Sequence, residues 1–144
     1  MKTLIAEDDM TSRLLMQKIL EPYGPYHCVE DGREAVEAVR IALGKGAPYD
    51  LICLDIMMPR MDGQTALVHI RELEDTELHE QAPRAKVIMT TALADRSNVI
   101  KACQHHCDHY LIKPIDKAKL IDKLSQLGLI PDKEEAGANA DPHR

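Results

Sequence analysis

The sequence has 144 residues, of which 44% are hydrophobic and 29% are charged, and its formal net charge is −6. This length fits a single domain with one core, which aliphatic residues and Met must fill because Phe and Trp are absent. No run approaches the ~20 apolar residues of a membrane span and no signal peptide is recognisable, so we expect a cytoplasmic protein without membrane contact. The negative charge argues against direct nucleic-acid binding, which needs clustered Lys and Arg.

Short apolar runs alternate with helical patterns along the chain. The predicted strands are residues 3–6, 26–29, 51–54, 86–90 and 110–112. The predicted helices are residues 11–20, 32–43, 64–73, 95–107 and 117–127, and an acidic surface loop fills 74–85. Such alternation predicts an α/β fold with a parallel sheet covered on both faces. We assign 1–129 to one domain and expect 130–144, which has little to bury, to be a disordered tail.

Three acidic residues lie at predicted strand ends. Asp8 and Asp9 follow the first strand, and Asp55 follows the third. Ligands of open parallel sheets bind outside the carboxyl ends of the strands, so these carboxylates converge if the first and third strands are neighbours. Two unit charges ~4 Å apart repel by about 4 kcal/mol at an effective dielectric near 20. Such a site requires a cation, and its oxygen ligands suit Mg²⁺.

Two further side chains complete this site. Thr91 follows the fourth strand and offers a hydroxyl, and Lys113 follows the fifth strand and offers a positive charge. A carboxylate, a metal, a hydroxyl and a cation together predict phosphoryl transfer, in which the protein positions groups and stabilises charge.

These residues belong to motifs that resemble the receiver domains of bacterial response regulators. The motifs are Glu7-Asp8-Asp9, residues 55–63 (DIMMPRMDG), Thr91-Ala92 and Lys113-Pro114, spread over residues 1–127. The resemblance implies a flavodoxin-like, doubly wound sheet of five parallel strands in the order 2-1-3-4-5, with five helices.

The resemblance also implies a role for each acid. Asp55 would be the phosphoacceptor, taking the group from a phosphohistidine of a sensor histidine kinase or a histidine phosphotransfer protein. Asp8, Asp9, Asp55 and the backbone carbonyl of Met57 would hold Mg²⁺. The chain would be a signalling module and not an enzyme acting on separate substrates.

A switch is implied as well. Thr91 and Lys113 would contact the phosphoryl oxygens, and Tyr110 would move inward as Thr91 shifts. The surface of the fourth helix, fifth strand and fifth helix would then change its preference for a downstream protein target, as a population shift. The identity of the kinase and the target, and phosphorylation-dependent dimerisation, are left open.

The sequence departs from the family pattern at two places. His106 and His109 occupy a segment in which receivers commonly carry glycine. Met57 and Leu93 stand where the family places the side chains that set the lifetime of the aspartyl phosphate. Both are apolar and cannot orient a water molecule, so we expect slow self-dephosphorylation.

Each assignment has a simpler alternative. Asp8 and Asp9 could cap the first helix, and Thr91, Tyr110 and Lys113 could be ordinary strand-end residues. The four cysteines are interpreted as small core residues of a reduced protein. The cluster formed by Cys103, His105, His106, Cys107 and His109 could instead bind zinc.

Two other functions compete with signalling. A Mg²⁺-dependent phosphatase or phosphotransferase also forms an aspartyl phosphate, but it usually needs a second acid near the nucleophile, where this chain has Met57, and a cap over the substrate. A degenerate receiver that binds partners without phosphorylation would not need the full set of acids, Thr91 and Lys113.

Overall fold

The computed structural model describes residues 1–79, 81–92, 97 and 107–131, and its centre is a five-stranded parallel sheet in the order β2-β1-β3-β4-β5. The strands are β1 (Thr3–Ala6), β2 (Tyr26–Val29), β3 (Leu51–Asp55), β4 (Lys86–Thr91) and β5 (His109–Ile112). The described helices are α1 (Met10–Leu20), the 3₁₀ helix η1 (Glu21–Tyr23), α2 (Gly32–Gly44), α3 (Gly63–Glu77) and α5 (Lys117–Gln126). The fold class and strand order are confirmed, whereas the expected helix 95–107, apart from residues 97 and 107, and the tail from residue 132 lie outside the described residues.

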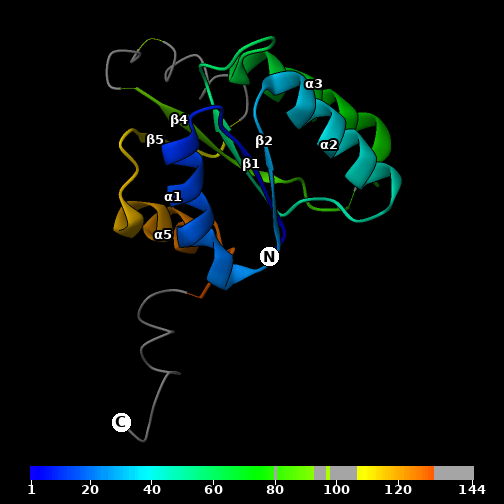
Figure 1. The fold of residues 1–144 in the computed structure, drawn as a ribbon. Coiled ribbons are helices and arrows are strands. Elements are labelled where there is room, and N and C mark those ends of the chain that lie inside the picture. The colour runs from blue at the N-terminus through cyan, green and yellow to red at the C-terminus, as the bar shows by residue number, and fades with distance from the viewer. Residues whose placement is uncertain (80, 93–96, 98–106, 132–144) are drawn as a thin grey trace, which may run out of the picture.

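Helices cover both faces of the sheet, with α2 and α3 on one face and α1 and α5 on the other (Figure 1). Side chains alternate along β1, so Leu4 and Ala6 pack in the core beneath α2 and α3, while Ile5 packs in the core beneath α1 and α5. This burial on both faces explains the continuous apolar run of β3, where every residue from Leu51 to Leu54 is buried. Among the described helices, none is long and apolar enough to cross a membrane.

The parallel register gathers the residues that follow the strands at one edge of the sheet. Ala6 pairs with Leu54, so extending the register by one residue brings Glu7 beside Asp55. On the other side of β3, Asp55 pairs with Thr90, and in the next strand pair Thr91 pairs with Ile112. Lys113, the residue after β5, therefore lies at the same edge, as the sequence predicts.

An aspartate caps each of the four described α-helices. The side chains of Asp9, Asp31, Asp62 and Asp116 each accept a hydrogen bond from a backbone N–H of the first helical turn. Such a cap stabilises a helix by about 1 kcal/mol. The caps explain why these helices begin where they do.

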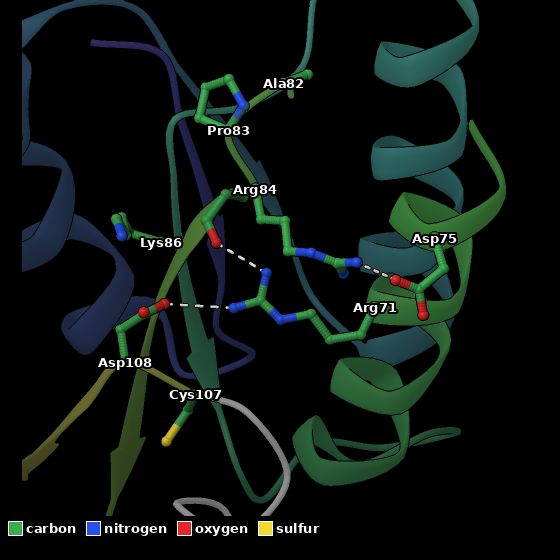
Figure 2. A pocket seen from close by; sticks show the side chains of 9 residues that line it. Arg71, Asp75, Ala82, Pro83, Arg84, Lys86, Cys107 and Asp108 are labelled. Atoms are coloured by element: carbon green, nitrogen blue, oxygen red, sulfur yellow. Dashed lines mark hydrogen bonds and ion pairs between the residues drawn. The ribbon is translucent and has the colours of Figure 1, made fainter. Parts of the chain in front are cut away.

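The prediction that an acidic loop begins at Glu74 is wrong. Helix α3 continues to Glu77, and the Glu74 side chain is buried. Arg71 Nη1 donates to Glu74 Oε1 (2.7 Å), and the Ala85 backbone N–H donates to Glu74 Oε2 (2.8 Å). Arg71 Nη2 also reaches Asp108 Oδ2 (3.3 Å), so this charge cluster joins α3 to the beginnings of β4 and β5 (Figure 2).

We predict that Gly63→Ala destabilises the fold. A Cβ atom at Gly63 would lie 2.1 Å from the backbone oxygen of Asp55, so the β3 end or the α3 start must shift. We expect the free energy of unfolding, measured by urea denaturation, to fall by about 2 kcal/mol. Gly44→Ala is the control because nothing lies within 4 Å of its added Cβ, and it should leave stability unchanged or slightly raised. Equal effects of the two substitutions would contradict the role of this close approach.

Candidate functional site

Three carboxylates converge at the carboxyl edge of the sheet. One ligand oxygen from each of Glu7, Asp8 and Asp55 lies within 4.8 Å of the others. Glu7 and Asp55 are 3% and 4% exposed, whereas Asp8 is exposed. The group therefore has two buried members and one that opens toward solvent, an arrangement accessible to an ion or a phosphoryl group.

Lys113 joins the two buried carboxylates. Its Nζ lies 2.5 Å from Glu7 Oε1 and 3.0 Å from Asp55 Oδ2. Its backbone N–H donates to the Thr91 oxygen (2.7 Å), which fixes the chain after β5 against the end of β4. The lysine is thus held by its backbone while its ammonium group reaches across to β1 and β3.

The ionisation of these groups shows how crowded the negative charge is. Burial, together with the hydrogen bond with Asp55, raises the pKa of Glu7 to about 7 against the opposing effect of Lys113. Burial alone would lower the pKa of Lys113, but its hydrogen bonds to Glu7 and Asp55 outweigh burial and raise it. One lysine faces three carboxylates, so a hard divalent cation with oxygen ligands fits this donor set.

Asp9 lies outside this group and caps α1. Its Oδ2 accepts a hydrogen bond from the Ser12 backbone N–H (2.8 Å), and this bond lowers the pKa of Asp9. Capping was the alternative that the sequence offered for Asp8 and Asp9, and the structure shows it for Asp9. The acid that lies close to Asp8 and Asp55 is Glu7 and not Asp9.

Sequence reasoning missed Glu7 as a member of this carboxylate group although a signal was present. Because Glu7 directly follows β1, the β1–β3 register places it beside Asp55. Counting from strand ends in register would have selected Glu7 and Asp8, whereas we selected the adjacent pair of aspartates.

The loop after β3 carries Met57. Its backbone N–H donates to Asp55 Oδ1 (3.3 Å), and its side chain is 61% exposed. The main chain of Met57 therefore lies against the Asp55 carboxylate, and its apolar side chain is largely exposed to solvent.

Thr91 and Tyr110 lie on neighbouring strands. Thr91 is fully buried at the end of β4, and its hydroxyl donates to the backbone oxygen of Ala92 (3.3 Å). Tyr110 is 42% exposed on the edge strand β5. Thr91 thus lies one residue beyond Thr90, the register partner of Asp55, and the Tyr110 side chain is partly exposed to solvent.

The cluster that the sequence offered as an alternative zinc site is only partly described. Cys103, His105 and His106 lie outside the described residues, as does Leu93. Cys107 packs against the core beneath α2 and α3, and Cys28 and Cys53 also pack in the core. Burial lowers the pKa of His109.

A separate cavity of about 650 Å³ lies at the opposite edge of the sheet (Figure 2). Its charged walls include Arg71 and Arg84, of which Arg71 pairs with Glu74 and Asp108, and Arg84 pairs with Asp75. Because these cations have acidic partners within the protein, we interpret the cavity as part of the structural charge cluster.

Comparisons with known proteins agree with this geometry. The family model "Response regulator receiver domain" matches residues 3–125. The chain is 30% identical over 128 residues to chemotaxis protein CheY of Bacillus subtilis, with 87% of this chain and 95% of that protein covered. It is 34% identical over 126 residues to hybrid signal transduction histidine kinase B of Dictyostelium discoideum, covering 83% of this chain but only 6% of that protein.

Solved structures show the same likeness. The receiver domain of sensor histidine kinase PA1611 from Pseudomonas aeruginosa, with magnesium coordinated in its active-site cleft, has a TM-score of 0.70 at 27% identity over 87% of this chain and 94% of that chain. CheY in the CheX–CheY–BeF3–Mg²⁺ complex of Borrelia burgdorferi has a TM-score of 0.73 at 27% identity, covering 88% of each chain. The chain belongs to the response regulator receiver domain family.

We predict that Glu7→Gln weakens Mg²⁺ binding and Asp9→Asn does not. The first substitution removes a charge from the converging carboxylates, and the second keeps the helix cap because Asn caps as well as Asp. Isothermal titration with Mg²⁺ should show an affinity loss of about tenfold or more for Glu7→Gln. A comparable loss for Asp9→Asn would restore Asp9 as a ligand.

Proposed function

We propose that this chain accepts a phosphoryl group on Asp55 in a Mg²⁺-dependent reaction and transmits a signal by binding other proteins. The observation that carries this proposal is the buried Asp55 carboxylate, which is hydrogen-bonded to Lys113 and lies within 4.8 Å of the ligand atoms of Glu7 and Asp8. Membership of the receiver family, and the magnesium ion in the cleft of the PA1611 receiver domain, support the same interpretation.

The phosphoryl donor would be a phosphohistidine of a histidine kinase or a histidine phosphotransfer protein. A carboxylate oxygen of Asp55 attacks phosphorus, the P–N bond breaks, and the imidazole leaves with its electron pair and takes up a proton. Glu7, Asp8, Asp55 and the Met57 carbonyl would hold Mg²⁺, whose charge would offset that of the phosphoryl oxygens. Lys113 is already hydrogen-bonded to Asp55 and supplies a second positive charge at the reaction centre.

Phosphorylation would then change the end of β4. The Thr91 hydroxyl donates to Ala92 in this structure, and a phosphoryl oxygen would be a stronger, charged acceptor. Movement of Thr91 would free space for Tyr110, which packs on the neighbouring strand. The surface around β5 and α5 would thereby favour a different protein partner, by a shift in population between two states.

Several features favour a signalling role over a separate enzymatic one. Met57 stands where a phosphatase would need a second acid, and its thioether cannot donate a proton. Relatives of similar length include a chemotaxis protein, and the structure of the Borrelia burgdorferi relative was solved in a complex with the protein CheX. We therefore propose a cytoplasmic signalling phosphoprotein whose output is a downstream protein target.

We predict that acetyl phosphate with Mg²⁺ adds one phosphoryl group to the protein. Intact-mass spectrometry should show the added mass in the wild type and not in Asp55→Asn, because the amide lacks the nucleophilic oxygen. Asp50→Asn is a matched control, since Asp50 directly precedes the same strand at its other end. A wild type that is not labelled, or an Asp55→Asn variant labelled as well as the wild type, would remove the proposal.

We predict that Met57→Asn shortens the lifetime of the phosphorylated protein. An amide two residues after Asp55 can orient a water molecule for attack on phosphorus, whereas the exposed thioether cannot. Loss of the phosphoryl mass from purified protein should accelerate on the order of tenfold. Met57→Leu keeps the side chain apolar and should match the wild type, and equal rates for all three proteins would refute the explanation.

A further inference from the structure

An ion pair ties the loop after β3 to the start of α2. Arg60, in the middle of this loop, donates from Nε to Asp31 Oδ2 (2.5 Å). Asp31 is only 2% exposed, and its other oxygen accepts the Glu34 backbone N–H (2.8 Å) as the cap of α2. One buried carboxylate therefore both begins α2 and holds the β3–α3 loop.

The backbone of the loop is bound at the same place. The Gly32 N–H donates to the Met61 oxygen (2.9 Å). A Cβ atom on Gly32 would lie 2.4 Å from that oxygen, so only glycine allows this approach. The first residue of α2 and the Asp31 side chain thus contact neighbouring residues of the loop.

Arg60 adopts a backbone conformation that non-glycine residues rarely adopt. Its φ is +65°, in the left-handed region. Such conformations persist where the surrounding structure holds them, and they are frequent at functional sites. Here the Met61 N–H donates to the Pro59 oxygen (2.7 Å) across Arg60, and the Arg60 side chain pairs with Asp31. Burial would raise the pKa of Asp31, but the hydrogen bonds from the Glu34 N–H and Arg60 lower it.

The loop held in this way connects directly to the acceptor. At its ends, the Ile56 N–H donates to the Thr90 oxygen (3.0 Å), and the Gly63 N–H donates to the Ile56 oxygen (2.9 Å). Between them lies Met57, whose N–H donates to Asp55 Oδ1. The position of the Met57 carbonyl relative to Asp55 therefore depends on how the middle of the loop is held.

We propose that Arg60 and Asp31 are positioning residues that fix the β3–α3 loop, so that the Met57 carbonyl is pre-arranged to bind Mg²⁺ beside Asp55. This role rests on the proposed function, and neither residue touches the reacting atoms. Asp31 and Arg60 would act on metal affinity through the loop, as outer partners of ligands commonly do.

The first test is Mg²⁺ titration by calorimetry in a double-mutant cycle. Arg60→Gly removes the side chain and tolerates the positive φ, and Asp31→Asn removes the charge but still caps α2. Each should raise the Mg²⁺ dissociation constant by about tenfold, and the double variant should be no worse than either single one. Arg40→Ala is the control because Arg40 pairs with Glu37 within α2, and it should bind Mg²⁺ as the wild type does.

The second test needs no metal. Hydrogen–deuterium exchange of the metal-free protein should be faster at residues 57–62 in Arg60→Gly and Asp31→Asn, with unchanged protection in β1 and β3. Unchanged Mg²⁺ affinity in both single variants, fully additive losses, or unchanged exchange in the loop would each overturn the proposal. If the wild type binds Mg²⁺ but is not labelled on Asp55, the proposed function fails while this cycle still decides the role of the pair.

Discussion

The constraint on which the site depends is the burial of like charges at one edge of a parallel sheet. The register between β1 and β3 places Glu7 beside Asp55, and two such charges ~4 Å apart repel by about 4 kcal/mol at an effective dielectric near 20. Lys113 reaches from the end of β5 to both carboxylates and offsets part of this repulsion. Burial and the neighbouring Asp55 raise the pKa of Glu7 despite this lysine. The edge is therefore already arranged for additional positive charge, and a hard divalent cation supplies it.

Much of this arrangement was predictable from the sequence, because it follows from strand ends. Alternating strands and helices imply a parallel sheet, and parallel strands end at a common edge, so Asp55 and Lys113 could be placed together without coordinates. The structure differs from the sequence prediction at Asp9 because three consecutive acids fit the motif in more than one alignment. Two structural facts distinguish these acids. The β1–β3 register places Glu7 beside Asp55, and the hydrogen bond from the Ser12 N–H makes Asp9 the cap of α1.

Other features have no local signal in the sequence. Glu74 belongs to an acidic stretch that indicates a solvated helix end, yet it is buried because Arg71 and the Ala85 N–H satisfy its oxygens. The partners lie 3 and 11 residues away, and the second is a backbone group on the next connection. The pair between Asp31 and Arg60 spans 29 residues and depends on a positive φ that composition does not reveal. Long-range charge pairing of this kind requires the folded chain.

The charge cluster at the amino ends of β4 and β5 is paired within the protein, whereas the two buried acids at the carboxyl ends share one lysine. This difference favours a switch at the carboxyl ends. At the amino edge of β4 and β5, Arg71 is bonded to Glu74 and Asp108, and Asp108 also accepts the Val87 N–H. Removing one partner of a buried pair costs about 3–5 kcal/mol, so this edge resists rearrangement. At the carboxyl edge, Lys113 is shared between Glu7 and Asp55 and would gain a stronger acceptor if Asp55 carried a phosphoryl group. A change of charge at Asp55 is therefore expected to move the carboxyl ends of β4 and β5 while their amino ends stay fixed, which confines the response to the strand ends that carry Thr91 and Lys113.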